Sequence, residues 1–400
     1  MATSLTVEVA IVGGGPAGLT AAIALADAGI NTALIARPPP PDQRTSALLA
    51  GSVAALETLG VWQACAAQAA PLRVMRIVDA TARLIRAPEV RFVAAEIGLD
   101  AFGQNIENRH LVAALDARAR TLEPLKRIDD EAVAVETSLN NVTVSLKSGD
   151  AVTARLVIGA DGRRSLCRAA AGIESRSRSY PQTALTFNLA HTRPHRDTST
   201  EFHTESGPFT LVPLPGQRSG LVWVTEPDEA RRVRALDDAA LGAEIEQRSH
   251  SILGKITVEP GRGSFPLAIE TARQFAVARV ALIGEAAHAL PPIGAQGFNL
   301  SVRDIATLAE LVADAKGHRR DPGGPEVIEG YDRARRADTT TRKFTVDLLN
   351  RSLLSNFLAV QGARGLALYM LDHIGPLRRA LMREGVAPAS VPRLMRGDRS

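Results

Sequence analysis

The sequence predicts an α/β protein with two domains and a C-terminal helical tail. Its 400 residues are too many for one hydrophobic core and too few for three independent cores. Near the start, a β-branched run, a glycine-rich turn and a segment of strong helix formers predict a buried parallel strand followed by a helix. Residues 180–265 instead alternate apolar and polar side chains between turn-rich segments, which is typical of strands.

The first predicted strand, Thr6 to Val12, leads into the motif Gly13-x-Gly15-x-x-Gly18 at the start of a helix that ends near Ala28. A tight turn, a close backbone approach to a pyrophosphate and close helix–sheet packing all require glycine here. The N-terminal N–H groups of the helix then face the phosphates. Within a complete strand–helix–strand unit, the motif predicts a Rossmann-like domain whose dinucleotide contacts Gly13, Gly15, Pro16, Ala17 and Gly18.

The end of the second strand lacks an expected residue. An acidic side chain that holds the ribose hydroxyls normally follows the motif by about 20 residues, but the sequence there reads Leu34-Ile35-Ala36-Arg37. Loss of one charge-assisted hydrogen bond costs roughly 1.5–3 kcal/mol, which would weaken dinucleotide binding without abolishing it. Arg37 could instead stack on the adenine, or it could be an exposed loop arginine before the prolines at 38–41.

Two later buried strands end in polar or glycine-rich turns. Leu156 to Ile158 leads to Asp161-Gly162, and Val280 to Ile283 leads to Gly284-Glu285. Open α/β sheets bind ligands at such strand ends. We therefore expect a discontinuous cofactor-binding domain of residues 1–71, 99–179 and 270–345, a sheet-rich substrate domain of residues 72–98 and 180–269, and a C-terminal helical segment of residues 346–400.

Composition excludes several other classes of protein. The two cysteines, Cys65 and Cys167, form no CxxC pair, so we expect a reducing compartment and no structural zinc. The eight histidines have no metal-ligand spacing. A net charge of +4 gives no support for nucleic-acid binding. The uncharged segment from Val9 to Ala26 is interrupted by glycines and follows no basic region, so we expect neither a signal peptide nor a membrane helix.

The tail combines apolar helical stretches, between Leu348 and Leu377, with a basic end. The arginines of this end outnumber its two acidic residues; they are Arg378, Arg379, Arg383, Arg393, Arg396 and Arg399. Such a tail could be a solvated cap on the cofactor domain. It could also contact an anionic membrane surface or a multi-enzyme assembly.

These motifs occur in the order and at the spacings of the single-component flavin hydroxylases, which include p-hydroxybenzoate hydroxylase. The chain most closely resembles the ubiquinone-biosynthesis branch, over nearly its whole length. Two departures concern the segment after Glu285: Gly294-Ala295-Gln296 stands where the branch commonly has Ala-Gly-Gln, and Ser301 where it commonly has Gly. The resemblance rests on Asp42-x-Arg44, Asn108-Arg109, Asp161-Gly162 with Ser165 and Arg168, Gly207 to Trp223, Gly284 to Asn299, and the tail from Leu349 to Arg383.

The resemblance implies a p-hydroxybenzoate hydroxylase-like fold that binds FAD. Glu285, where the family usually has Asp, would accept hydrogen bonds from the ribityl hydroxyls, and Arg44 and Arg109 would reach the pyrophosphate and ribityl region. Both arginines could alternatively form surface ion pairs. Beyond the first motif, the expected FAD contacts are Arg37, Arg44, Arg109, Asp161, Gly162, Gly284, Glu285, Pro291, Gly294, Gln296, Gly297, Phe298 and Asn299.

The resemblance further implies a cytoplasmic monooxygenase, with the inner membrane surface as a possible place of peripheral contact. NAD(P)H, docking transiently, would reduce FAD; O2 would add at flavin C4a; and the hydroperoxide would transfer oxygen to the ring of a polyprenylated phenol. No catalytic base stands out, and His288 is more typical of a structural strand-end histidine than of a catalytic one. Pocket candidates, each with core packing as an equal alternative, are Phe209, Leu211, Trp223, Pro291 and Phe298.

Other functions remain open at this point. A related hydroxylase could act on a soluble phenol, and an isoprenoid reductase has a similar fold. A flavin halogenase would need a Trp-x-Trp pair, whereas Trp62 and Trp223 are far apart. A non-catalytic flavoprotein could scaffold a quinone-biosynthesis complex, with Ala36 and Glu285 as signs of decay.

Overall fold

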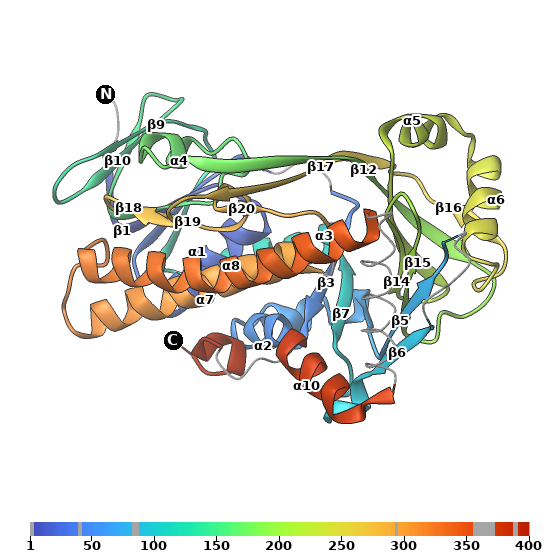
Figure 1. Ribbon diagram of the computed structural model, residues 1–400. Helices are drawn as coiled ribbons and strands as arrows, with labels where there is room; N and C mark the ends of the chain where they lie inside the picture. The colour runs from blue at the N-terminus through green and yellow to red at the C-terminus, as the bar shows by residue number, and fades with distance from the viewer. Residues whose placement is uncertain are drawn as a thin grey trace.

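The computed structural model describes residues 4–38, 42–81, 88–292, 295–354, 373–386 and 391–399; the side chains of Gln296 and of residues 340–354 are not described. Two large sheets lie at opposite ends of the molecule, and the helices α7 (Gln296–Gly317) and α8 (Pro325–Leu354) run side by side along it (Figure 1). This architecture confirms the α/β class, with a parallel Rossmann-like sheet and a second, mainly antiparallel sheet.

The first sheet has the strand order β18-β19-β11-β1-β2-β8, and β19, β11, β1, β2 and β8 pair in parallel. The strands β18, β9 and β10 join it in antiparallel pairs. Its central strand is apolar on both faces, and Val9, Ala10 and Ile11 are fully buried, as expected for a parallel strand covered on both sides. α1 (Pro16–Asp27) packs against α3 (Asn108–Ala119) and α7. The strands are β1 Ser4–Val12, β2 Thr32–Ile35, β8 Leu125–Ile128, β9 Ala132–Thr137, β10 Val142–Leu146, β11 Ala151–Gly159, β18 Ala276–Val277 and β19 Val280–Leu282.

The second sheet has the order β20-β17-β12-β15-β14-β13-β5-β6, with β16 paired to β12. The long strands β12 and β17 run from this sheet toward the first one and so connect the two halves (Figure 1). Their bounds and those of the neighbouring strands are β5 Val74–Asp79, β6 Val90–Val93, β12 Ser175–His191, β13 Thr198–His203, β14 Pro208–Leu214, β15 Arg218–Thr225, β16 Ile256–Val258, β17 Gly263–Ala272 and β20 His288–Ala289.

A small third sheet, β3-β7-β4, lies between the two large ones. Asn105 on β7 donates to the carbonyl of Pro213 at 2.8 Å, and Arg218 donates to Glu107 at 2.8 Å, so this sheet is tied to the second one. The remaining elements are β3 Thr45–Leu49, β4 Ala69–Pro71, β7 Gly103–Glu107, α2 Ala50–Thr58, α4 Leu166–Ala170, α5 Pro227–Ala235, α6 Asp238–Arg248, α10 Gly375–Val386, and the short 3-10 helices η1 Trp62–Ala64, η2 Ala66–Gln68, η3 Ala94–Ile97, η4 Gly284–Ala286 and η5 Arg393–Arg396.

The two faces of the second sheet differ in what covers them. On one face, Phe209, Leu211 and Trp223 are at most 2% exposed, because α5 and α6 pack over them. The guanidinium of Arg248 on α6 lies 4.5 Å from the Trp223 ring. Of the two alternatives for these three side chains, the structure supports core packing beneath the helices, and a contribution to a substrate pocket stays a prediction. Because successive side chains of a strand point to opposite faces of the sheet, the residues next to them in β14 and β15 lie on the other face.

That opposite face is turned toward the rest of the molecule. Val224 packs in one buried cluster with Leu290 and Leu300, which lie beyond β19 and at the start of α7. Val222 is partly buried against the same cluster, and Thr210 and Val212 are half-buried beside it.

In the described part of the chain, no helix is long and apolar enough to cross a bilayer.

The difference between the faces can be tested with two substitutions on β15. Trp223→Ala removes a fully packed ring, and we expect the free energy of unfolding to fall by about 3–5 kcal/mol. Val222→Ala on the other face should cost about 1 kcal/mol, because less apolar surface leaves water there. Urea unfolding of both variants measures the difference; losses of equal size would contradict the assignment of the faces.

Candidate cofactor site

The carboxyl ends of three parallel strands meet at one edge of the first sheet. β1 pairs with β11, and β11 with β19, both in parallel. A Cβ atom added to Gly13 would lie 2.3 Å from the carbonyl oxygen of Ala160, and one added to Gly284 would lie 3.2 Å from the Cβ of Ala17. The structure thus brings together the strand ends at positions 13, 161 and 284. Open α/β sheets bind their ligands at such an edge.

The first glycine motif leaves room in front of α1 and fills the space behind it. A Cβ at Gly18 would lie 1.8 Å from the carbonyl oxygen of Gly13, so only glycine fits where helix and turn touch. A Cβ at Gly15 would meet no atom within 4 Å. The motif therefore combines tight internal packing with open space at the start of the helix, as a bound pyrophosphate requires.

Two helices begin at this edge without a side-chain cap. α1 follows an extended Gly15, has Pro16 in its first turn and carries no acidic residue there. α7 follows Ala295, whose φ of +56° is left-handed, and Ser301 in its second turn lies against Gly284. The first N–H groups of a helix have no partner within the helix, and they attract anions. This donor set fits the pyrophosphate of FAD at α1 and the electron-rich edge of the flavin at α7.

Arg44 is held next to this edge by a bidentate ion pair. Its Nε and Nη2 donate to Asp42 at 2.9 and 2.8 Å, and Asn108 donates to the same carboxylate at 2.8 Å. Burial raises the pKa of Asp42, but these donors lower it overall. Asp42 in turn raises the pKa of Arg44, with a smaller contribution from Glu285. Arg44 also lies over the Phe265 ring, 5.3 Å from its centroid.

The other two predicted arginines also form ion pairs. Arg109 lies 2.6 Å from Glu107, a buried carboxylate that Arg218 also contacts. Arg37 lies 2.7 Å from Glu131, and both side chains are about half exposed. Arg109 therefore has the ion-pair partner that was the alternative to a cofactor contact, and Arg37 is the exposed loop arginine that was the alternative to stacking on the adenine. The FAD contacts of both stay predictions.

The two carboxylates predicted to contact the cofactor have different roles. Asp161 accepts from the Ser165 hydroxyl at 2.6 Å and from the Cys167 N–H at 3.1 Å, so its side chain shapes the turn before α4. Glu285 is about half exposed, and its Oε2 lies 3.7 Å from Arg163. Beside Asp161, a Cβ at Gly162 would meet no atom within 4 Å. Glu285 thus remains accessible as an acceptor for a ligand hydroxyl.

Asn299 connects α7 to β3 through its side-chain amide. Its Oδ1 accepts from the Leu49 N–H at 2.8 Å, and its Nδ2 donates to the Ala47 carbonyl at 2.7 Å. These bonds to backbone groups position β3 against α7, and the contact of Asn299 with FAD stays a prediction. In the same segment Pro291 is buried, Phe298 packs against the core, and Gly297 has open space in front of it. Gly294 and the side chain of Gln296 lie outside the described residues.

A buried charged network behind the edge was not predicted. Asp304 on α7 is fully buried and accepts from the Gly284 N–H at 3.0 Å, while His288 Nε2 lies 2.7 Å from the same carboxylate. Arg335 on α8 donates to Asp304 at 2.7 Å. His288 is therefore structural, as its position at a strand end indicated. Arg335 and Arg303 also share Asp338, which extends the network along both helices.

Thiol and metal chemistry find no support here. Burial raises the pKa of Cys65 to about 11 and also raises that of Cys167, so both thiols stay neutral. Among the described residues, no group of His, Cys, Asp or Glu has the arrangement of a metal site.

Comparison with known proteins identifies relatives over nearly the full chain. The family model described as an FAD binding domain matches residues 6–342. The chain is 34% identical to the ubiquinone hydroxylase UbiL of Rhodospirillum rubrum, covering 98% of this chain and 92% of that protein. It is 31% identical to the 3-demethoxyubiquinol 3-hydroxylase of Escherichia coli K12, covering 95% and 98%. The solved structure of p-nitrophenol 4-monooxygenase PnpA from Pseudomonas putida shares the fold, with a TM-score of 0.75, 20% identity, and 97% and 100% coverage.

The glycine motif makes a first prediction about this site. Gly15→Ala places a methyl group in open space, so we expect the stability of the apoprotein to change by less than about 0.5 kcal/mol. The same methyl group blocks the approach of the pyrophosphate, so the Kd for FAD should rise at least about tenfold. Gly18→Ala should instead destabilise the fold, since its Cβ meets the backbone of Gly13. Thermal unfolding and flavin fluorescence titration separate the two effects; unchanged FAD affinity in Gly15→Ala would refute this geometry.

The buried network makes a second prediction. Asp304→Asn removes the fully buried one of the two carboxylates that Arg335 contacts, and we expect the free energy of unfolding to fall by about 3–5 kcal/mol at pH 7. Burial alone raises the pKa of Asp304, but His288 and Arg335 lower it overall. The charged carboxylate therefore stabilises the wild type fully above the unfolded-state pKa of about 3.9, and this contribution is lost as the pH falls further toward the folded-state value.

Urea unfolding between pH 7 and pH 3 measures this effect. The stability difference between wild type and Asp304→Asn should shrink below about pH 4. Asp228→Asn, at an exposed position on α5, should change stability by less than about 1 kcal/mol and serves as the control. A difference that stays constant with pH would show that Asp304 is not charged in the fold.

Proposed function

The chain belongs to the FAD-binding family of aromatic-ring hydroxylases and is an FAD-dependent monooxygenase, and from this premise we propose that it hydroxylates the ring of a polyprenylated phenol in ubiquinone biosynthesis. NAD(P)H and O2 are the co-substrates in this proposal. The observation that carries it is the relation, at more than 30% identity over nearly the whole chain, to two proteins named as hydroxylases of ubiquinone or its precursor.

FAD, when bound, supplies the transfer of electrons from NAD(P)H and the activation of O2. The chain contributes binding and orientation. The N–H groups of α1 hold the pyrophosphate, and Glu285 accepts from the ribityl hydroxyls. The N-terminus of α7 favours negative charge on the neighbouring edge of the flavin ring, by about 0.3–1 kcal/mol. The Asp304 network keeps the start of α7 in register with the strand ends, so these contacts are preorganised.

The substrate face in this proposal is the side of the second sheet that carries Val212 and Val222. These side chains are half-buried, and their neighbour Val224 packs with Leu290 and Leu300 from the cofactor half. An apolar face of this kind removes water from around an aromatic ring. The sequence missed these residues because the larger aromatic side chains alternate with them. The alternation of side chains between the two faces of β14 and β15 is the sequence signal that could have indicated Val212 and Val222.

The same face carries a polar group for the phenol oxygen. Thr210 donates to Glu201 at 3.3 Å, and His203 Nε2 lies 2.8 Å from the other oxygen of Glu201. A hydroxyl with a fixed acceptor behind it is oriented, so in the proposal Thr210 orients the ring through its phenolic group. Thr210→Val should therefore raise the KM for the phenol several-fold and leave the FAD content unchanged. Thr198→Val, at the first residue of β13, where the hydroxyl donates to the Arg196 carbonyl at 3.1 Å, is the control.

Turnover of the purified protein tests the proposed reaction. NADH or NADPH oxidation should rise when a phenol is added, with one atom of oxygen inserted into the product. Mass spectrometry of the quinone precursors that accumulate in cells without the protein then identifies the blocked step. Bound FAD that NAD(P)H does not reduce would contradict catalysis and support the scaffold alternative.

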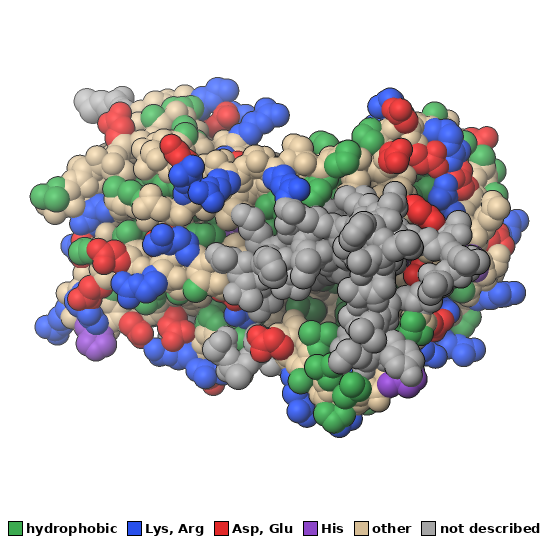
Figure 2. Space-filling model, viewed as in Figure 1, with side chains coloured by type: hydrophobic (Ala, Val, Ile, Leu, Met, Phe, Trp, Pro, Cys, Tyr) green, Lys and Arg blue, Asp and Glu red, His purple; other side chains and the backbone are tan. Residues whose placement is uncertain are grey.

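We also propose that the protein works in the cytoplasm and meets its polyprenylated substrate at the inner membrane surface through α10. Leu377 and Leu381 are 42% and 51% exposed, and their spacing of four residues places them on one side of α10. Ile374, just before the helix, is 42% exposed. Hydrophobic side chains gather at the bottom of the molecule in the view of Figure 2, where α10 lies in Figure 1. Arg379 and Arg383 add positive charge beside them, and each arginine near an anionic lipid surface contributes about 1 kcal/mol.

Vesicle binding tests this surface. Leu377→Gln combined with Leu381→Gln should reduce co-sedimentation with vesicles of phosphatidylglycerol and phosphatidylethanolamine at least several-fold, because apolar burial is lost. Leu139→Gln changes a more exposed leucine, at 88%, in the turn between β9 and β10 and should bind as the wild type does. Equal binding of the double variant and the wild type would exclude α10 as the contact.

A further inference from the structure

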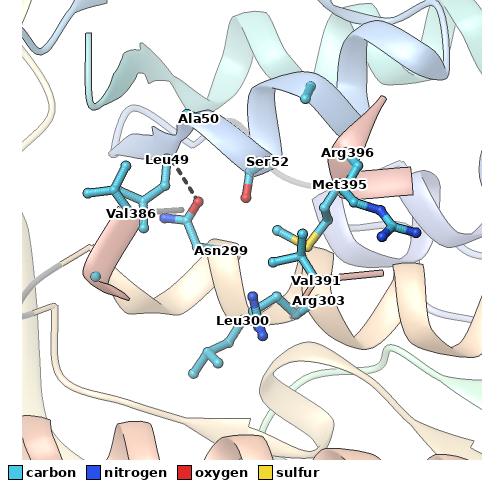
Figure 3. Close-up of a pocket in the computed structure, with 13 residues that line it drawn as sticks. Leu49, Ala50, Ser52, Asn299, Leu300, Arg303, Val386, Val391, Met395 and Arg396 are labelled. Atoms are coloured by element: carbon cyan, nitrogen blue, oxygen red, sulfur yellow. Dashed lines mark hydrogen bonds between the residues drawn. The ribbon is translucent and has the colours of Figure 1, made fainter. Parts of the chain in front are cut away.

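A cavity, which we call the α2 cavity, lies away from the strand-end edge, between α2, the start of α7 and the C-terminal residues (Figure 3). Its volume is about 380 Å³, which falls within the usual range for small-molecule sites, about 300–1,000 Å³. Its walls are mostly apolar and come from four parts of the chain. They include Leu49, Ala54, Leu300, Val386, Val391 and Met395.

One polar side chain in the wall has no partner. Ser52 is fully buried, and in the described part of the chain its hydroxyl makes no hydrogen bond. Figure 3 shows this hydroxyl pointing into the cavity. Native structures rarely bury a hydroxyl without a partner, because the group loses its hydrogen bonds to water on folding. A ligand that supplies an acceptor to Ser52 would restore that bond.

The charged and donor groups around Ser52 all favour an anion. Ser52 lies in the first turn of α2, a nine-residue helix with no side-chain cap, so the N–H groups of Gly51 and Ser52 have no partner within the helix. Arg303 binds Asp338 through Nε and Nη2, and within the described residues its Nη1 has no hydrogen-bond partner. Arg396, whose Nε lies 3.6 Å from Asp398, also lines the cavity, and among the described residues of the wall none is acidic.

We propose that this cavity binds a small monocarboxylate with an apolar body. The carboxylate accepts hydrogen bonds from the Ser52 hydroxyl and the start of α2, with Arg303 nearby. The apolar body lies against Leu300, Val386 and Met395. This site does not depend on the hydroxylation proposed above, since none of the groups assigned to flavin or phenol binding supplies its donors.

A ligand bound in the cavity should change the surroundings of the bound cofactor. Asn299 lines the cavity and, through its amide, also fixes β3 to α7. A ligand therefore contacts the back of the junction whose other side borders the strand ends. Binding should shift the visible absorbance of bound FAD by a small, saturable amount.

Calorimetric titration of the FAD-loaded full-length protein with decanoate, in the absence of NAD(P)H and phenol, tests the proposal. We expect one saturable site, and much weaker binding of decylammonium, which reverses the charge on the same apolar chain. Ser52→Ala should weaken decanoate binding about tenfold, the loss expected for one hydrogen bond to a charged group. Thr58→Ala removes a hydroxyl from the same helix outside the cavity, where it donates to the Ala54 carbonyl at 2.8 Å, and should bind as the wild type does.

A second variant keeps the test decisive if Ser52→Ala is poorly folded. Ala54→Leu fills the cavity from the same helix and should abolish decanoate binding while the melting temperature stays within a few degrees of the wild type. The absence of saturable binding to the wild type, equal affinity for decanoate and decylammonium, or equal losses in Ser52→Ala and Thr58→Ala would each overturn the proposal. Failure of phenol-stimulated turnover with decanoate binding intact would count against the proposed function alone.

Discussion

The buried carboxylate of Asp304 holds the cofactor edge of this molecule together. A charge removed from water must be matched by hydrogen bonds and opposite charge, or the fold loses several kcal/mol. Here the three donors come from three separate segments: the backbone after β19, the side chain of His288, and Arg335 on α8. If any of these donors moved away, the Asp304 charge would lose a partner in an apolar interior. The position of the strand end relative to α7 and α8 is therefore fixed.

This constraint explains how one helix serves several purposes. The start of α7 faces the strand ends through Ser301, holds β3 through Asn299 and borders the α2 cavity through Leu300. The β12 and β17 strands extend from the second sheet toward the same region, so the apolar face with Val222 is carried on a continuous framework. The site is thus built on rigid elements, which favours precise placement of a flavin and an aromatic ring.

The local parts of this design could be predicted from the sequence. The α/β class, the parallel strands and the glycine turn at Gly13 to Gly18 follow from patterns within about thirty residues, and FAD as cofactor follows from the resemblance they support. The role of Asn299 could not be predicted, since its partner at Leu49 is 250 residues away. Asp304 lies only 16 to 31 residues from its partners, but its burial among them depends on how α7 packs against the strand end and α8, which no local pattern specifies. The burial of Trp223 depends on which sheet face α5 and α6 cover, and alternation alone does not specify that face.

A crystal structure of the protein with FAD bound tests the central claim most directly. We expect the pyrophosphate oxygens within hydrogen-bond distance of the backbone N–H groups at the start of α1, a ribityl hydroxyl on Glu285, and the flavin ring between the start of α7 and the Val222 face. A flavin bound elsewhere, or a start of α1 that makes no contact with the pyrophosphate, would contradict the account.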